Sequence, residues 1–173
     1  MARTITIVIT ILFLCGAVRA QQGESSIAAG PVISFPLKSY GYSSYLKTGT
    51  GLELIGQHSF SNRSSFLSDM GWVFYRVRPQ TVGYETDDRS IFSFKLGYKY
   101  TFGASGVFLN GLVGTDIEQK ESYISFTFGA GKRFLIKDAY FIDAGVDYIE
   151  GDTEPRLNIK VLFSVLRRNK END

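Results

Sequence analysis

Apolar and polar residues alternate with a period of two along much of this chain, and the clearest stretch runs from Ile91 to Phe102. Because successive side chains of a β-strand point to opposite faces of a sheet, such alternation predicts a strand with two different faces. One face would be aromatic and apolar, comprising Phe92, Phe94, Leu96, Tyr98, Tyr100 and Phe102. The other would be mostly small or charged, comprising Ile91, Ser93, Lys95, Gly97, Lys99 and Thr101. A helix would scatter these aromatic residues around its circumference.

Weaker versions of the same pattern predict seven further strands, separated by clusters of turn residues. The predicted strands are 27–35, 46–57, 66–78, 91–102, 107–117, 124–131, 140–148 and 157–165. The predicted connections are 38–44, 59–65, 79–89, 103–106, 118–121, 135–138 and 150–155. Strands of about 9–13 residues are long enough to cross a hydrocarbon core at a tilt. Strands of soluble sheets average about 5–6 residues. The fold class is therefore all-β: an up-and-down antiparallel barrel of about eight strands.

Two features favour a barrel whose apolar face points outward into lipid over a soluble, lipocalin-type barrel with an apolar cavity. Small residues line the polar face, as suits a narrow eight-stranded lumen. They are Gly97, Gly129, Gly131, Gly145, Ser93, Ser125 and Ser164. Aromatic residues lie near strand ends on the apolar face, as in the girdles at membrane interfaces. They are Tyr100, Phe102, Phe134, Tyr140 and Tyr148. In a closed barrel every backbone amide within lipid also has a hydrogen-bond partner on a neighbouring strand.

Three segments carry a resemblance to a known family: FSFKLGYKYTFG (92–103), YISFTFGAGKRF (123–134) and LNIKVLFSV (157–165). They resemble strands of the small outer-membrane β-barrel proteins, the porin-like, OmpA-type transmembrane class. The resemblance implies a bacterial outer-membrane location, lipid and lipopolysaccharide as neighbours, insertion by the barrel-assembly machinery, and a monomer. Two departures affect the ends of the first and last strands. Members usually end on an aromatic residue, whereas ten residues follow Phe163, and Pro31 removes a ladder hydrogen bond from the first strand.

The N-terminus has the organisation of a cleaved secretory signal. Arg3 precedes an apolar run, 4–18, that is shorter than the roughly 20 residues of a membrane-spanning helix. Val18 and Ala20 suit the −3 and −1 positions of a cleavage site near Ala20. The predicted organisation is a signal peptide (1–20), a barrel (21–166) and a charged periplasmic tail (167–173).

Export changes what the composition implies. The signal holds the only cysteine, Cys15, and two of the nineteen Lys and Arg residues. The remaining seventeen balance the seventeen Asp and Glu residues, so the pI of the precursor is no argument for nucleic-acid binding. No zinc-ligand cluster, calcium loop, phosphate-binding loop or dinucleotide fingerprint occurs, and neither a metal nor a cofactor is expected.

The parity of the strands places six charged residues on the inward face: Glu53, Lys95, Lys99, Asp143, Asp147 and Lys160. Asp143 and Asp147 lie on the strand next to that of Lys160, so ion pairing is geometrically feasible. Because desolvation costs several kcal/mol per ion, buried charges need partners. The preferred interpretation is a closed structural network that fills the lumen; the alternative is a gated polar path for small ions.

His58, the only histidine, lies in the sequence QHSFSNRSS, which resembles the His-x-Ser-Asn motif of outer-membrane lipid A deacylases. A histidine beside a serine could act as base and nucleophile. Ser61 and Asn62 lie one residue too far along, however, and the connection is predicted to be periplasmic, whereas lipid A occupies the outer leaflet. Acidic residues mark two predicted outer loops, where divalent cations could bridge lipopolysaccharide. They are Glu85, Asp87, Asp88, Glu150, Asp152 and Glu154.

The sequence therefore predicts a non-catalytic outer-membrane barrel with a structural or surface-interaction role. Three alternatives remain: a small-solute channel, a lipid A-modifying envelope enzyme, and a soluble periplasmic ligand-binding barrel.

Overall fold

The computed structural model describes residues 24–37, 46–77, 88–118, 121–137, 140–151 and 154–167. The predicted signal peptide and residues 168–173 of the predicted tail lie outside this set, as do Glu85, Asp87 and Asp152. Eight strands and one short 3₁₀ helix form the described part. They are β1 (Glu24–Pro36), β2 (Leu46–Ser59), β3 (Ser64–Val77), β4 (Arg89–Phe102), η1 (Gly103–Ser105), β5 (Val107–Glu118), β6 (Glu121–Lys137), β7 (Tyr140–Gly151) and β8 (Arg156–Arg167).

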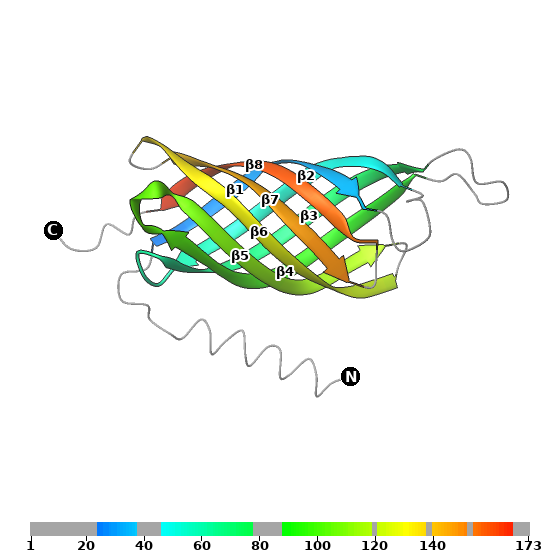
Figure 1. The fold of residues 1–173 in the computed structure, drawn as a ribbon, viewed down its shortest axis with the longest axis horizontal. Coiled ribbons are helices and arrows are strands. Elements are labelled where there is room, and N and C mark those ends of the chain that lie inside the picture. Colours follow the sequence, from blue (N-terminus) through cyan, green and yellow to red (C-terminus); the bar gives the residue numbers. More distant parts are fainter. Residues whose placement is uncertain are drawn as a thin grey trace, which may run out of the picture.

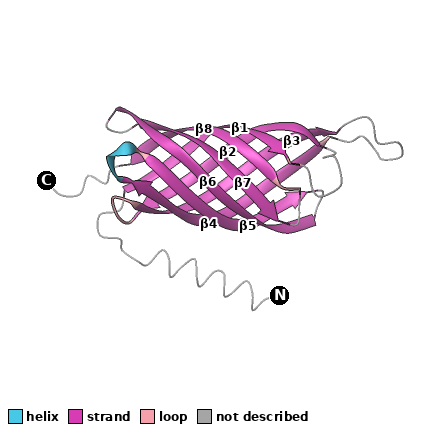
Figure 2. Ribbon diagram, in the orientation of Figure 1, coloured by secondary structure: helices cyan, strands magenta, loops and turns pink. Residues whose placement is uncertain are grey.

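The strands form a closed antiparallel barrel in chain order, with β8 pairing back onto β1 (Figures 1 and 2). The closing ladder runs from Ser25 opposite Arg167 to Pro36 opposite Arg156. Each strand thus has a hydrogen-bonded neighbour on both sides, and no edge is left open. The predicted eight-stranded, up-and-down, all-β fold is confirmed. Within the described ranges no helix has the length and apolar character needed to cross a membrane.

The predicted facing of the strands is also confirmed. On β4, Phe94, Tyr98 and Phe102 are exposed on the outer surface, whereas Lys95 and Lys99 are buried inside the barrel. The outward residues of the other strands continue a belt of exposed large apolar side chains around the molecule. Examples are Leu52, Leu54, Met70, Trp72, Leu109, Val113, Ile124, Phe126, Phe128, Val146, Ile159 and Phe163. A soluble barrel would require the reverse arrangement.

Most of the strands extend beyond their predicted ranges. Strand β6 extends to Lys137, well beyond the predicted end at residue 131. Lys132 and Arg133 break the apolar pattern, but Arg133 points inward, and the Lys132 ammonium lies 5.3 Å from the outward Phe134 ring. Strand β1 begins at Glu24, three residues before its predicted start. Strand β8 continues to Arg167, the first residue of the predicted tail. Pro31 lies within β1, where it pairs with Leu52 of β2 but has no partner on β8.

The interior is not lined by polar residues alone. Five apolar side chains pack together in its middle: Ala28, Ile55, Leu67, Leu112 and Leu162. A second cluster contains Val32, Val73, Tyr75 and Ile91. The Tyr75 hydroxyl also makes a buried hydrogen bond of 2.6 Å with Ser34. These apolar groups fill space between the buried charges, on an inward face that the sequence predicts to be mostly small or charged.

Candidate functional site

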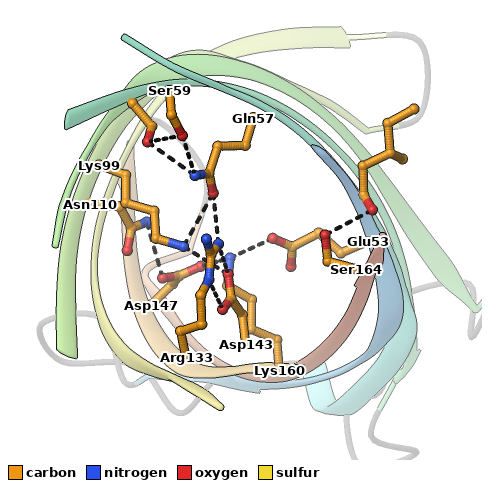
Figure 3. Close-up of polar contacts among 12 residues, drawn as sticks. Glu53, Gln57, Ser59, Lys99, Asn110, Arg133, Asp143, Asp147, Lys160 and Ser164 are labelled. Carbon is orange, nitrogen blue, oxygen red and sulfur yellow. Dashed lines mark hydrogen bonds and ion pairs between the residues drawn. The ribbon is translucent and has the colours of Figure 1, made fainter. Parts of the chain in front are cut away.

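The candidate site is the charged interior of the barrel, and at its centre one lysine lies between two carboxylates. The Lys160 ammonium is 2.5 Å from Glu53 Oε1 and 2.5 Å from Asp147 Oδ2 (Figure 3). All three side chains are buried, and they come from β8, β2 and β7. Asp147 also accepts a 3.4 Å hydrogen bond from Asn110. This central cluster therefore ties strands together across the lumen.

A second cluster lies toward the end of the barrel where β1 begins and β8 ends. Asp143 Oδ2 is 2.7 Å from the Lys99 ammonium and 2.7 Å from Arg133 Nη2, while Arg133 Nε donates to Asp143 Oδ1 at 2.8 Å. Gln57 Oε1 accepts from both cations, at 2.8 Å from Arg133 and 3.4 Å from Lys99 (Figure 3). The Arg133 guanidinium stacks on the Phe141 ring, 3.5 Å from its centroid. One carboxylate here serves two cations.

A third cluster lies toward the opposite end and again places one carboxylate between two cations. Asp116, fully buried, is 2.5 Å from Arg156 Nη2 and 3.5 Å from the Lys95 ammonium. Ser93 donates to Asp116 at 2.7 Å, and Lys95 donates to Thr127 at 2.9 Å. Asp116 is thus satisfied by two cations and a hydroxyl, which offsets much of the desolvation cost of burying it.

The structure buries all six predicted lumen residues and brings them into these three clusters. It also adds four charged residues that the sequence reasoning missed: Asp69, Asp116, Arg133 and Arg156. Strand parity could have found Arg133 if the alternation had been extended past residue 131. Gly111 and Gly114 interrupt the pattern around Asp116, and Arg156 lies one residue before the predicted start of its strand. The inward neighbours of Asp69 on β3 are largely apolar, so the alternation of polar and apolar residues did not assign Asp69 to the inward face.

The charges alternate along the lumen. The two outer clusters each hold two cations and one carboxylate, whereas the central cluster holds one cation and two carboxylates. Asp69 is buried, and no described cation forms an ion pair with it, although Lys160 and Lys95 lie near enough to interact electrostatically. With Asp69 included, the described interior holds five basic side chains and five carboxyl groups, and their balance differs from one cluster to the next.

Two small cavities of about 20 Å³ each lie in the described interior beside the clusters. One is bordered by Lys99, Asn110 and Asp143, the other by Asp69, Lys95 and Asn158. A cavity of that size holds about one water molecule. The described residues contain no group of three or more His, Cys, Asp or Glu side chains able to hold a metal ion.

The structure does not pair His58 with Ser61. His58 lies on the outer face, and its Nδ1 is 3.0 Å from Ser25 Oγ on the neighbouring strand. Ser61 Oγ accepts from the backbone amides of Arg63 and Ser64, at 3.3 and 3.0 Å, and so stabilises the turn between β2 and β3. Of the acidic residues of the outer loops, Asp88 and Glu150 are exposed and Glu154 is half-buried.

Close packing against the central cluster explains why residue 129, on the inward face of β6, is a glycine. A Cβ added at Gly129 would lie 1.8 Å from Asp147 Oδ1 and 2.6 Å from Asn110 Oδ1. Gly129→Ala must displace Asp147, and we expect it to lower the free energy of unfolding by about 1–3 kcal/mol. The matched control is Gly111→Ala, where an added Cβ meets no atom within 4 Å. Urea unfolding in micelles measures both; equal stabilities would contradict this account of Gly129.

The fold and its charged interior define a class of protein, the small eight-stranded β-barrels. No family model and no curated protein matches the chain. Among solved structures, it is similar to Ail, the attachment invasion locus protein of Yersinia pestis, crystallised with sucrose octasulfate. That match has 24% identity and a TM-score of 0.60, and it covers 86% of this chain and all of Ail.

Two further solved structures have the same architecture. Neisserial surface protein A has 14% identity and a TM-score of 0.60, covering 84% of this chain and 98% of that one. The outer-membrane protein OprG from Pseudomonas aeruginosa has 12% identity and a TM-score of 0.62, covering 86% and 97%. The chain therefore has the fold of the small eight-stranded outer-membrane barrels.

Proposed function

We propose that this protein is an integral β-barrel of the bacterial outer membrane, with a structural or surface-interaction role and no catalytic activity. The belt of exposed apolar and aromatic side chains around the closed barrel carries the proposal. Its members include Trp72 (51% exposed), Phe128 (62%) and Phe163 (58%). Monomeric soluble proteins rarely expose so continuous an apolar surface, because its hydration is unfavourable. Lipid acyl chains would cover the belt and keep its apolar side chains out of water.

The packed interior argues against the solute channel. The three charge clusters and the apolar groups between them cross the lumen, and the two described cavities beside them hold about one water molecule each. An ion would have to displace the Lys160 pairs to pass. The network therefore serves best as a structural core that joins distant strands.

The proposed orientation places both ends of the barrel sequence, at Glu24 and Arg167, on the periplasmic side. The connections after β1, β3, β5 and β7 would then face outside, among them the acidic segments near Asp88 and Glu150. Outer-membrane lipid and lipopolysaccharide would surround the barrel, the barrel-assembly machinery would insert it, and it would function as a monomer.

Membrane fractionation, followed by gel electrophoresis in SDS with and without boiling, tests the proposal. We expect recovery in the outer membrane and a heat-dependent change in mobility, because a closed barrel resists SDS until it is heated. We also expect no stepwise conductance in planar bilayers. Recovery as a soluble periplasmic protein without a mobility change would refute the membrane location, and reproducible conductance would instead support the channel.

A further inference from the structure

The barrel has a recess at the end where β1 begins and β8 ends, and we name it the terminal mouth. It is lined by Gln57, Ser59, Ser65, Thr101, Gly106 and Arg133, among others, and its volume is about 770 Å³. That volume falls within the usual range for small-molecule sites, roughly 300–1,000 Å³. By contrast, the two described cavities beyond its floor are about 20 Å³ each. A small molecule could therefore enter the terminal mouth, whereas each of those two cavities has room for about one water molecule.

Arg133 forms part of the floor and is held in a fixed orientation. Its Nε and Nη2 donate to Asp143, Nη2 also donates to Gln57, and the guanidinium plane stacks on Phe141. The backbone amide of Arg133 donates to Gly106 at 2.8 Å. No described residue accepts a hydrogen bond from Nη1, and the side chain remains 19% exposed. Arg133 thus has spare donors whose direction is already set, which reduces the entropy lost on binding a ligand.

The charge balance at the floor is positive. Arg133 and Lys99 share the single carboxylate of Asp143, and Gln57 contributes only a neutral amide oxygen. The barrel walls have a low dielectric constant and focus the field of this excess charge into the recess. The rim adds polar groups, the hydroxyls of Ser59 and Ser65, which hydrogen-bond to each other at 3.0 Å. Cationic and hydroxyl donors together suit an anionic, strongly hydrated ligand better than an apolar one.

We propose that the terminal mouth is a binding site for a carboxylate or phosphate group, recognised by the free edge of the Arg133 guanidinium. Two sources could supply the carboxylate or phosphate group. One is a free anionic metabolite. The other is the chain itself, because β8 ends at the terminal mouth and the residues that follow it in the sequence include Glu171 and Asp173. The site does not depend on the proposed membrane location, since the recess belongs to the closed barrel.

The test titrates the full-length protein in non-ionic micelles with citrate and, separately, with inorganic phosphate. NMR shifts of the backbone amides of Ser65 and Gly106 report on binding. We expect saturable shifts for the unaltered protein and an affinity lower by roughly tenfold or more for Arg133→Gln, because a charge-assisted hydrogen bond is lost. Lys132→Gln is the matched control, because it removes the neighbouring positive charge from the outer face. Its affinity should change less than about twofold, since exposed charges are well screened.

Further variants keep the test decisive. If Arg133→Gln fails to fold, Arg133→Lys keeps the charge but loses the planar fork, and it should still weaken binding severalfold. The double variant Glu171→Gln/Asp173→Asn separates the sources. Tighter citrate binding after this change would identify the tail as the natural occupant, and unchanged binding would identify a free anion. Absence of saturable shifts, or equal losses in Lys132→Gln and Arg133→Gln, would overturn the proposal.

Discussion

Replacing Lys160 with methionine is expected to lower the free energy of unfolding by about 3–5 kcal/mol, the usual cost of removing one partner from a buried ion pair. Lys160 is the only described cation that forms ion pairs with Glu53 and Asp147, at 2.5 Å from each. Without Lys160, the buried carboxylates of Glu53 and Asp147 would lie near each other and near Asp69, and neither would have a described ion-pair partner. Methionine fills a similar volume, so the loss reports mainly on charge and not on a cavity.

Urea unfolding in micelles, followed by fluorescence, gives the measurement. The single tryptophan, Trp72, is exposed on the outer face and packs against Phe74, so its emission reports transfer from an apolar environment to water. The control is the triple variant Lys160→Met/Glu53→Gln/Asp147→Asn, which removes all three charges. We expect it to recover much of the lost stability, because a neutral replacement of a buried ion cluster is often tolerated. A single variant as stable as the unaltered barrel would mean that water already reaches these carboxylates.

Replacing Val113 with arginine is expected to cost about 2–4 kcal/mol, as for a charge at the middle of the lipid-facing surface of a barrel. Val113 lies midway along β5, is 50% exposed, and sits on the outer face between Leu96 and Phe126 of the neighbouring strands. In the membrane the charge of the introduced arginine would face acyl chains. On the surface of a soluble protein the same change would be nearly neutral.

The matched control is Ile117→Arg, on the same face of β5 but one residue from its end. An arginine there can reach the headgroups, so its cost should fall to about 0–1 kcal/mol. Folding titrations of both variants in lipid bilayers measure the difference. Equal and small costs at the two positions would show that the belt does not face hydrocarbon, and they would count against the proposed membrane location.

Much of the fold could be predicted from the sequence because a strand has a side-chain period of two. The alternation of β4 was enough to assign Lys95 and Lys99 to the interior and Phe94 to the outer face. Once eight such segments were found between turns, a closed antiparallel barrel was the arrangement that leaves no edge. Strand ends were less accurate because single charged residues break the pattern: Arg133 points inward without ending β6.

Local alternation is thus enough to assign the strand count, the facing of the side chains and the six inward charges. It does not say which of those charges meet, because pairing across the lumen depends on register and barrel closure, which join residues far apart in the chain. Lys160 and Glu53 are an example, brought to 2.5 Å across the barrel. The same closure gathered Arg133, Gln57 and Asp143 into the floor of the terminal mouth. No local pattern marks that recess, since its lining comes from turns and strand ends whose neighbours are set by the whole fold.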